Sequence, residues 1–304
     1  MSKLLSGRKI AIIGGDRREL VLMRELVHLG ATVMVVGYDR LSFLPEGLAH
    51  HGLREALRDA DGVILPMPGT DEQGRVKAEF AGTSLFLKPE HLALLKPGTP
   101  LLVGVANDYL RSEAASLDLK LIETAELDEI AIYNSIPTAE GAIAIAMRET
   151  SITLHGAQLL IVGFGRIGMT LARMLKGIGG EVCVVARKEA DLARAEEQGH
   201  RVFNYGTVVS VLHRVDVLFN TVPHPVVTED WLKKLKPEAV LIELASPPGG
   251  IDYGLAEALG LKMLKAMGLP GKAAPVTAGN ILGRVYPKLL LEQWKQGENE
   301  EGAQ

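Results

Sequence analysis

A glycine-rich turn near the middle of the chain constrains the fold more than any other sequence feature. The turn follows an apolar strand at 159–162 and opens an amphipathic helix at 166–178. Its residues are Gly163, Phe164, Gly165, Arg166, Ile167 and Gly168. This spacing is typical of a dinucleotide-binding unit, in which the glycines permit a tight turn, the approach of backbone amides to a pyrophosphate, and close helix packing. A glycine turn that binds nothing is the alternative, and the flanking strand and helix disfavour it.

The end of the next strand indicates which dinucleotide binds. NAD-binding domains carry an acidic residue about 20 residues beyond the fingerprint, where it bonds to ribose hydroxyls. This chain has Arg187 and Lys188 there, and a guanidinium can hold a 2′-phosphate through charge-assisted hydrogen bonds. We therefore expect NADP, with NAD possible; the alternative is that both cations are simply solvated. Loops after later strands place Thr221, Ala245 and Ser246 as expected ribose and nicotinamide contacts.

The order of apolar and amphipathic segments predicts an α/β fold with two Rossmann-like, doubly wound domains and an interdomain cleft. A length of 304 residues suits two such domains. In the first half we expect strands at 9–14, 32–37, 62–65 and 101–105, and helices at 19–29 and 89–95. In the second half we expect strands at 159–162, 181–186, 217–220, 240–243 and 262–265, with helices at 166–178 and 189–198.

The predicted domains are a flavodoxin-like or Rossmann-like substrate domain at 1–136 and a cofactor domain at 137–276. A bridge helix at 137–150, with Pro137 in its first turn, links them. A C-terminal helix at 277–294 is expected to return to the first domain, followed by a frayed polar tail at 297–304.

The first strand ends in a turn that resembles a phosphate loop but lacks its later glycines. Asp16 and Glu19 occupy the positions of the second and third glycine, so we expect no second dinucleotide here. Asp16 and Arg18 lie at the carboxyl edge of the predicted sheet and are expected to bind a carboxylated substrate. Pairing of Arg18 with a neighbouring acid is the alternative. The polar segment 66–83 follows another strand end, where open α/β sheets place their ligands.

Polar residues also gather where the chain passes into the second domain, in a predicted hinge at 127–141. Asn134, Ser135 and Glu140 are the candidate catalytic residues, with Glu140 as the proton carrier, and Thr138 is a candidate substrate contact. A capping network for the bridge helix would use the same residue types, and the two interpretations stay open.

Composition excludes several classes of function. The net charge of -4 and the scattered cations argue against a nucleic-acid partner. No apolar run reaches the roughly 20 residues that cross a bilayer, and the first eight residues do not suit a signal peptide, so we expect a cytoplasmic protein without membrane contact. The single cysteine, Cys183, lies in an apolar run and is expected to be buried. No metal site is expected.

Four motifs occur together in this chain: the turn Gly14-Gly15-Asp16 with Arg18, the stretch 130–138, the fingerprint at 163–170, and Gly268-Leu269-Pro270-Gly271 leading to 274–279. In this combination the chain resembles the family formed by the A-subunits of dipicolinate synthase from spore-forming bacteria. The resemblance implies oxidation of the cyclic hydroxytetrahydrodipicolinate, or its dehydrated form, to pyridine-2,6-dicarboxylate during sporulation. It also implies that the partner is the flavoprotein-like B-subunit of dipicolinate synthase, and we expect a homo-oligomer. Pro247 and His224 depart from the pattern expected of relatives.

Two other functions remain as alternatives. A 2-hydroxyacid dehydrogenase shares the two-domain plan, but it needs a histidine paired with an acid, and His224 is the last histidine of the chain. An NADP-binding subunit without catalysis is the other, since a cofactor site alone does not prove turnover.

Overall fold

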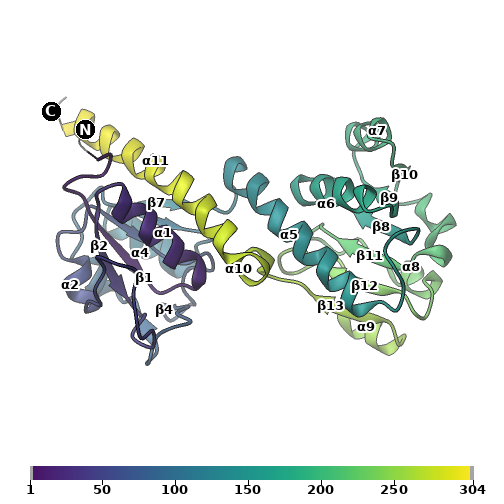
Figure 1. Cartoon of the computed structure of the whole chain (residues 1–304), viewed down its shortest axis with the longest axis horizontal. Coiled ribbons are helices and arrows are strands. Elements are labelled where there is room, and N and C mark those ends of the chain that lie inside the picture. Colours follow the sequence, from purple (N-terminus) through teal and green to yellow (C-terminus); the bar gives the residue numbers. More distant parts are fainter. Residues whose placement is uncertain (1–2, 302–304) are drawn as a thin grey trace. The chain divides into compact units, whose positions relative to one another are not determined.

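The computed structural model describes residues 3–301 and divides them into two compact units. Unit 1 comprises residues 3–131 and 275–301, and unit 2 comprises residues 132–274. Each unit has its own parallel sheet with helices packed against it (Figure 1). The division falls inside helix α5 (Asp128–Glu149).

Unit 1 is built on a five-stranded parallel sheet in the order β2-β1-β3-β6-β7. The strands are β1 (Lys9–Ile13), β2 (Thr32–Val36), β3 (Gly62–Ile64), β6 (Pro100–Val103) and β7 (Lys120–Glu123). The helices are α1 (Arg17–His28), α2 (Leu53–Leu57), α3 (Pro89–Leu92), α4 (Asp108–Ser116) and α11 (Pro275–Glu301). This strand order is flavodoxin-like. All five strands are parallel, and the order in which strands are added to the sheet reverses between β1 and β3. Strands β3 and β6 are buried throughout and β1 and β2 over four of their five residues, as is typical of parallel sheets, whereas the edge strand β7 is partly exposed.

Helix α11 packs in the core of unit 1. Tyr286, Leu290 and Trp294 recur at helical spacing and are buried in the core beneath α1 and β1. The Trp294 Nε1 donates to the carbonyl of Asp61 at 2.7 Å. Helix α11 continues to Glu301, past the predicted helix end near Trp294 and into the predicted tail from 297. Residues 302–304 of that tail lie outside the described residues.

The polar segment after β3 contains a small antiparallel hairpin of β4 (Arg75–Val76) and β5 (Leu85–Phe86). The hairpin is tied to the end of β1, since the Gly15 amide donates to the Lys77 carbonyl at 2.8 Å and the Glu79 amide donates to the Gly15 carbonyl at 2.9 Å. The segment is therefore an ordered extension of the sheet edge, where the sequence predicts only a loop.

Unit 2 carries a six-stranded parallel sheet in the order β10-β9-β8-β11-β12-β13. Its strands are β8 (Gln158–Val162), β9 (Glu181–Val185), β10 (Arg201–Phe203), β11 (Val217–Asn220), β12 (Val240–Glu243) and β13 (Lys262–Lys265). Its other helices are α6 (Arg166–Gly177), α7 (Glu189–Glu197), α8 (Glu229–Lys234), α9 (Tyr253–Ala258) and α10 (Leu269–Ala273). This is the doubly wound order of dinucleotide-binding domains, which confirms the predicted fold class.

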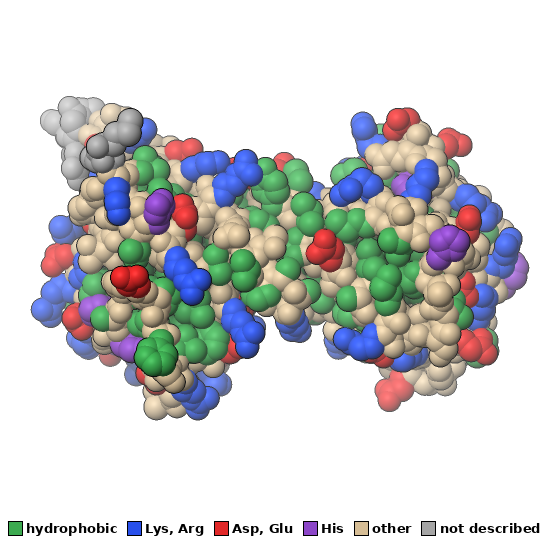
Figure 2. Space-filling model, viewed as in Figure 1, with side chains coloured by type: hydrophobic (Ala, Val, Ile, Leu, Met, Phe, Trp, Pro, Cys, Tyr) green, Lys and Arg blue, Asp and Glu red, His purple; other side chains and the backbone are tan. Residues whose placement is uncertain are grey.

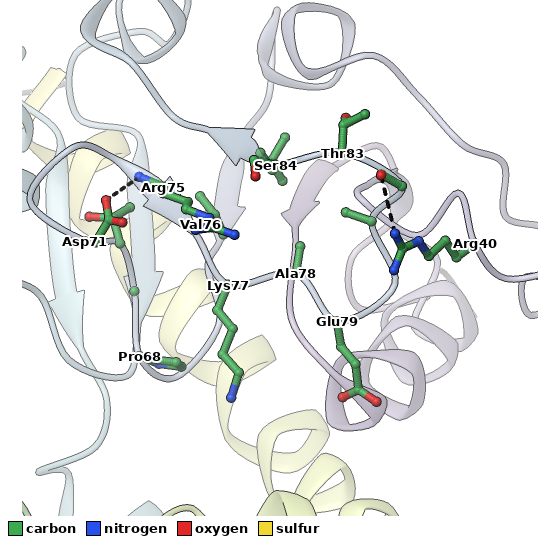
Figure 3. Close-up of a pocket in the computed structure, with 15 residues that line it drawn as sticks. Arg40, Pro68, Asp71, Arg75, Val76, Lys77, Ala78, Glu79, Thr83 and Ser84 are labelled. Atoms are coloured by element: carbon green, nitrogen blue, oxygen red, sulfur yellow. Dashed lines mark hydrogen bonds between the residues drawn. The ribbon is translucent and has the colours of Figure 1, made fainter.

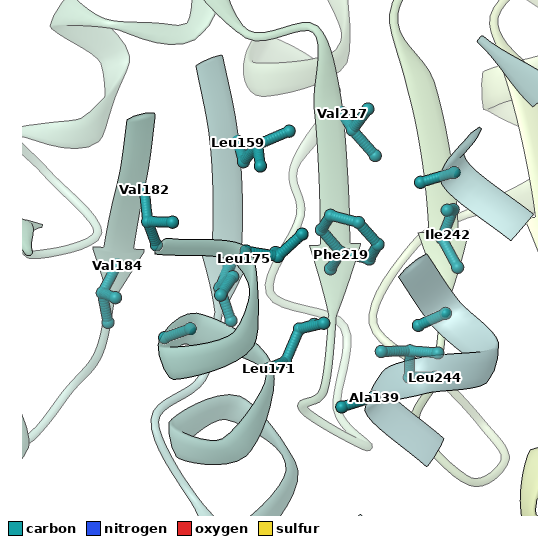
Figure 4. Close-up of a cluster of buried hydrophobic side chains, with 14 of the residues drawn as sticks. Ala139, Leu159, Leu171, Leu175, Val182, Val184, Val217, Phe219, Ile242 and Leu244 are labelled. Carbon is teal, nitrogen blue, oxygen red and sulfur yellow. The ribbon is translucent and has the colours of Figure 1, made fainter. Parts of the chain in front are cut away.

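Helix α6, which follows the fingerprint, packs against the core of unit 2. Leu171 and Leu175 of α6 are fully buried against Leu159 and Phe219 of the sheet (Figure 4). Cys183 is buried on β9 as expected.

The two units divide between residues 131 and 132, within the predicted hinge at 127–141, but α5 makes this segment helical. The helix begins at Asp128, so Pro137 lies in its interior and residues 128–141 are helical. Proline is frequent in first turns, which suggests the later start, but Asp128 and Glu129 supply the acidic first turn that favours an earlier one. By length and composition the 22-residue helix α5 could span a membrane, and 44% of its most apolar 18-residue window is buried. Its Ala139, Ala142 and Ala146 belong to the core of unit 2.

On the face shown in Figure 2, Lys and Arg lie among Asp, Glu and apolar residues.

Candidate functional site

A pocket of about 540 Å³ lies in unit 2 at the carboxyl ends of β8 and β11, where the strand order reverses. We call it the dinucleotide pocket, because open α/β sheets bind their ligands at this point. All predicted cofactor residues except Gly168 line it: Gly163, Phe164, Gly165, Arg166, Ile167, Arg187, Lys188, Thr221, Ala245 and Ser246.

The three fingerprint glycines have different surroundings. Gly163 has φ +96°, and a side chain there would meet the Thr221 hydroxyl. A Cβ on Gly168 would collide with the Gly163 carbonyl, so this residue allows α6 to approach the strand. A Cβ on Gly165, in contrast, would meet nothing within 4 Å. The open space at Gly165 is the place where a pyrophosphate fits against the backbone.

The start of α6 leaves backbone donors available to such an anion. Its N-cap, Gly165, forms no side-chain cap, and the first turn has no acidic residue. In α1 the N-cap Asp16 accepts from the Arg18 amide at 3.0 Å, while Glu19 accepts from the Asp16 amide at 2.7 Å. The positive end of α6 is therefore free for phosphate, whereas that of α1 is satisfied by its own side chains.

A buried carboxyl group holds the loops after β11 and β12, which line the dinucleotide pocket. Glu243, at the end of β12, is 3% exposed and accepts from the Asn220 side-chain amide at 2.6 Å. It also accepts from the backbone amides of Ala245 (3.1 Å), Gly250 (2.8 Å) and Ile251 (3.2 Å). Asn220 in turn donates to the Val222 carbonyl at 2.9 Å. One side chain thus holds both strand-end loops that line the pocket.

The pocket also contains residues that sequence reasoning missed. Tyr205 stacks on Trp231 with ring centroids 5.8 Å apart, and burial raises the pKa of its hydroxyl against the opposing charge of Arg187. Asp191 and His224 line the same pocket. Tyr205 follows the short strand β10, which the sequence pattern does not reveal, so only the strand order brings it beside Arg187.

In unit 1, the end of β1 carries a buried charged cluster of Asp16, Arg18 and Glu19. Arg18 is 8% exposed, and its Nε and Nη2 donate to the two Asp16 oxygens at 2.9 and 2.8 Å. Burial opposes ionisation of Asp16, but the bonds and charge of Arg18 outweigh it and lower its pKa. Burial raises the pKa of Glu19 to about 7 despite the charge of Arg18. Arg18 thus shows the local pairing that was the alternative to substrate binding.

The raised pKa of Glu19 predicts a pH-dependent stability. A carboxyl group with a higher pKa when folded stabilises the fold at low pH, and this contribution disappears as pH rises from about 4.5 to about 7. The unfolding free energy of the parent should therefore fall between pH 4.5 and pH 7. In Glu19→Gln this fall should be smaller by up to roughly 3 kcal/mol. Urea unfolding at several pH values measures it, with the exposed Glu46→Gln as control. Parallel pH profiles of parent and Glu19→Gln would contradict the assignment.

The candidate residues on α5 have different environments. Ser135 is buried, with its hydroxyl 2.6 Å from the Ile132 carbonyl and 2.7 Å from the Thr170 hydroxyl. The Thr138 hydroxyl donates to the Asn134 carbonyl at 2.7 Å. The Asn134 Oδ1 is buried without a hydrogen-bond partner among residues 3–301. Glu140 is exposed. Both hydroxyls are therefore engaged by α5 itself or by Thr170 of α6, in the interior of α5 and not at its cap, whereas the Glu140 side chain is exposed.

No group of three or more His, Cys, Asp or Glu side chains suited to a metal occurs among the described residues.

Known proteins resemble the chain over nearly its whole length. A family model described as the N-terminal domain of the dipicolinate synthase A-subunit matches residues 9–125. The A-subunit of dipicolinate synthase from Bacillus subtilis (strain 168) is 40% identical over 290 residues, which cover 95% of this chain and 98% of that protein. The chain belongs to the dipicolinate synthase A-subunit family.

The solved structures agree with this membership. The crystal structure of the dipicolinate synthase A-subunit from Bacillus halodurans matches with a TM-score of 0.91 and 39% identity, covering 94% of this chain and 98% of that one. A transhydrogenase from Sinorhizobium meliloti, with a TM-score of 0.66 and 14% identity over 92% and 93% of the two chains, shares the fold.

The second half of this dipicolinate synthase family member matches a known cofactor-binding domain. A family model described as the NAD binding domain of D-isomer specific 2-hydroxyacid dehydrogenases matches residues 137–269, which include the whole dinucleotide pocket. The chain is an NAD(P)-dependent oxidoreductase subunit that binds a nicotinamide cofactor, as expected.

Proposed function

We propose that the chain oxidises a cyclic dicarboxylate, hydroxytetrahydrodipicolinate or its dehydrated form, to dipicolinate with NADP+. The observation that carries the proposal is the dinucleotide pocket, with open donors at α6 and Arg187 and Lys188 on its rim, in a chain of this family. From the hydroxylated form the overall change is the loss of one water and two hydrogens, from the dehydrated form it is the loss of two hydrogens alone, and in both cases the ring becomes aromatic. A bound nicotinamide supplies the hydride acceptor.

The residues of the chain would bind and position the reactants. The amides at Gly165 and Arg166 face the pyrophosphate position, and Thr221, Ala245 and Ser246 lie where ribose and nicotinamide are expected. The Ala245 amide already donates to Glu243, so its carbonyl is the group left for the cofactor. Glu140 is the proposed proton acceptor, since its carboxyl group is exposed and a carboxylate can act as a general base.

The biological setting is proposed from the family. We infer that the chain acts with the second, flavoprotein-like subunit of a dipicolinate synthase, in the cytoplasm of a sporulating cell. The single buried cysteine suits a reducing compartment.

The decisive assay supplies the cyclised substrate and NADP+ to the purified chain, with and without its partner, and follows absorbance of the reduced nicotinamide. We expect absorbance to rise with dipicolinate formation. Cofactor binding without turnover in either condition would favour the non-catalytic alternative. Turnover of a 2-hydroxyacid in place of the cyclic substrate would favour the dehydrogenase alternative.

Arg187 is predicted to select the phosphorylated cofactor. A charge-assisted hydrogen bond contributes roughly 1.5 to 3 kcal/mol, so Arg187→Ala should weaken NADP+ binding about tenfold or more while NAD+ binding changes little. Calorimetry with both cofactors measures the preference. Arg194→Ala, an exposed arginine on α7 outside the pocket, is the control. Equal affinity of the parent for NADP+ and NAD+ would contradict the assignment. Asp191, which lines the same pocket, would then be the first residue to test by substitution.

A further inference from the structure

We propose that a second pocket, in unit 1, binds the carboxylate groups of the substrate. This pocket of about 690 Å³ lies beside the β4–β5 hairpin, and we call it the hairpin pocket (Figure 3). The proposal rests on the proposed function for the identity of its ligand, a planar dicarboxylate. It replaces Arg18 as the principal carboxylate contact.

The position of the hairpin pocket is the first argument. The strand order in unit 1 reverses between β1 and β3. The pocket is lined by the segment that follows β3 and by Arg40, which follows β2. Ligands of open α/β sheets bind at this reversal, beyond the carboxyl ends of the strands. The dinucleotide pocket occupies the equivalent position in unit 2.

The hairpin is held in a defined conformation, as a binding site requires. Gly69 (φ +65°) and Gly74 (φ +75°) place their α-carbons so close to the carbonyls of Val105 and Leu87 that an added Cβ would lie 2.6 Å from each. Asp71 accepts from the backbone amides of Gln73 and Arg75 at 3.0 and 2.8 Å. Long segments between sheet strands that are ordered in this way are usually functional.

The charges of the hairpin pocket favour an anion. Arg40, Arg75 and Lys77 line it, against the acids Asp71 and Glu79. Within residues 3–301, the side-chain nitrogens of Arg75 and Lys77 form no hydrogen bond or ion pair, and Arg40 makes one long bond of 3.5 Å to the Gly82 carbonyl. Figure 3 shows Arg40 and Arg75 reaching from opposite sides, with Thr83 and Ser84 between them. Guanidinium groups without acidic partners are suited to bidentate carboxylate binding.

The state of Arg18 supports the same assignment. Its Nε and Nη2 are engaged by Asp16, and the side chain is nearly buried. Lys77 lies close enough for its charge to lower the pKa of Asp16, so its ammonium adds to the positive charge at this edge of the sheet. The ammonium of Lys77 and the guanidinium of Arg75 therefore have more capacity for a ligand than Arg18 has.

Binding of dipicolinate to the full chain, measured by calorimetry, tests the proposal. Arg75→Gln and Lys77→Gln should each weaken dipicolinate binding about tenfold or more, while pyridine-2-carboxylate, with one carboxylate, should bind the parent more weakly than dipicolinate. Lys96→Gln, an exposed lysine of the same unit outside the pocket, is the matched control and should bind like the parent. NADP+ affinity should be unchanged in all three variants.

The outcomes separate this proposal from the proposed function. Unchanged dipicolinate affinity in Arg75→Gln and Lys77→Gln, or no binding to the parent, overturns the hairpin pocket, even if the parent oxidises the cyclic substrate. Loss of dipicolinate binding in both variants supports the pocket even if the parent reduces no NADP+, in which case only the oxidation fails.

Discussion

Gly165→Val is expected to abolish cofactor binding while the chain stays folded. An added Cβ meets no atom within 4 Å, and the backbone at φ -84°, ψ -161° accepts a β-branched residue, so the unfolding free energy should change by less than about 1 kcal/mol. The valine would instead fill the space where the pyrophosphate approaches the amides of α6. Thermal unfolding with and without NADP+ measures the effect, and the shift seen in the parent should be absent.

Two other glycine variants make this test specific. Gly177→Ala, at the far end of α6, also meets no atom within 4 Å and should keep both stability and the cofactor shift. Gly168→Ala collides with the Gly163 carbonyl and should lose roughly 1 to 3 kcal/mol of stability. If Gly165→Val is folded and stabilised by NADP+ like the parent, the phosphate position assigned to this turn is wrong.

Glu243→Ala is expected to have the largest effect on stability. The change removes the acceptor of three backbone amides and one of the two acceptors of the Asn220 side-chain amide in a buried site. A buried donor without a partner costs about 1 to 3 kcal/mol, so the total loss should be at least about 3 kcal/mol. Because the same bonds hold both strand-end loops of the dinucleotide pocket, NADP+ affinity should fall as well. Urea unfolding and calorimetry measure the two effects.

Glu243→Gln provides the folded comparison if the alanine variant does not fold. It keeps the size of the side chain but replaces one accepting oxygen with a donor, so it should lose part of the stability and part of the affinity. The exposed Glu238→Ala on the same unit should change stability by no more than about 0.5 kcal/mol. Parent-like stability and NADP+ affinity in Glu243→Gln would show that this carboxyl group does not organise the pocket.

The cofactor domain is the most predictable part of the molecule from sequence. The expected strands at 217–220, 240–243 and 262–265 coincide with β11, β12 and β13. Buried parallel strands are continuous apolar runs, and the glycines of the fingerprint are required by local backbone geometry, so both signals are contained in short segments.

Local signals fail where a pattern has two meanings. Pro137 suits a helix start, and the polar stretch from Asn134 to Glu140 suits a hinge, yet both lie within α5. The buried alanines of that helix pack on the core of unit 2, and this packing outweighs the hydrogen bond that a proline cannot donate. The two-residue strands of the hairpin also escape prediction, because they are too short to show alternation.

The sequence by itself determined the α/β class, the dinucleotide turn and the cations beside it, since each depends on neighbouring residues. Only the tertiary structure decided how distant residues share their charges and hydrogen bonds. It left Arg75 and Lys77 without ion pairs among the described residues, and it placed Glu243 where it holds two loops. The physical reason is that solvation and pairing of a charged group are set by the atoms packed around it, and the strand order brings these atoms together from separate parts of the chain.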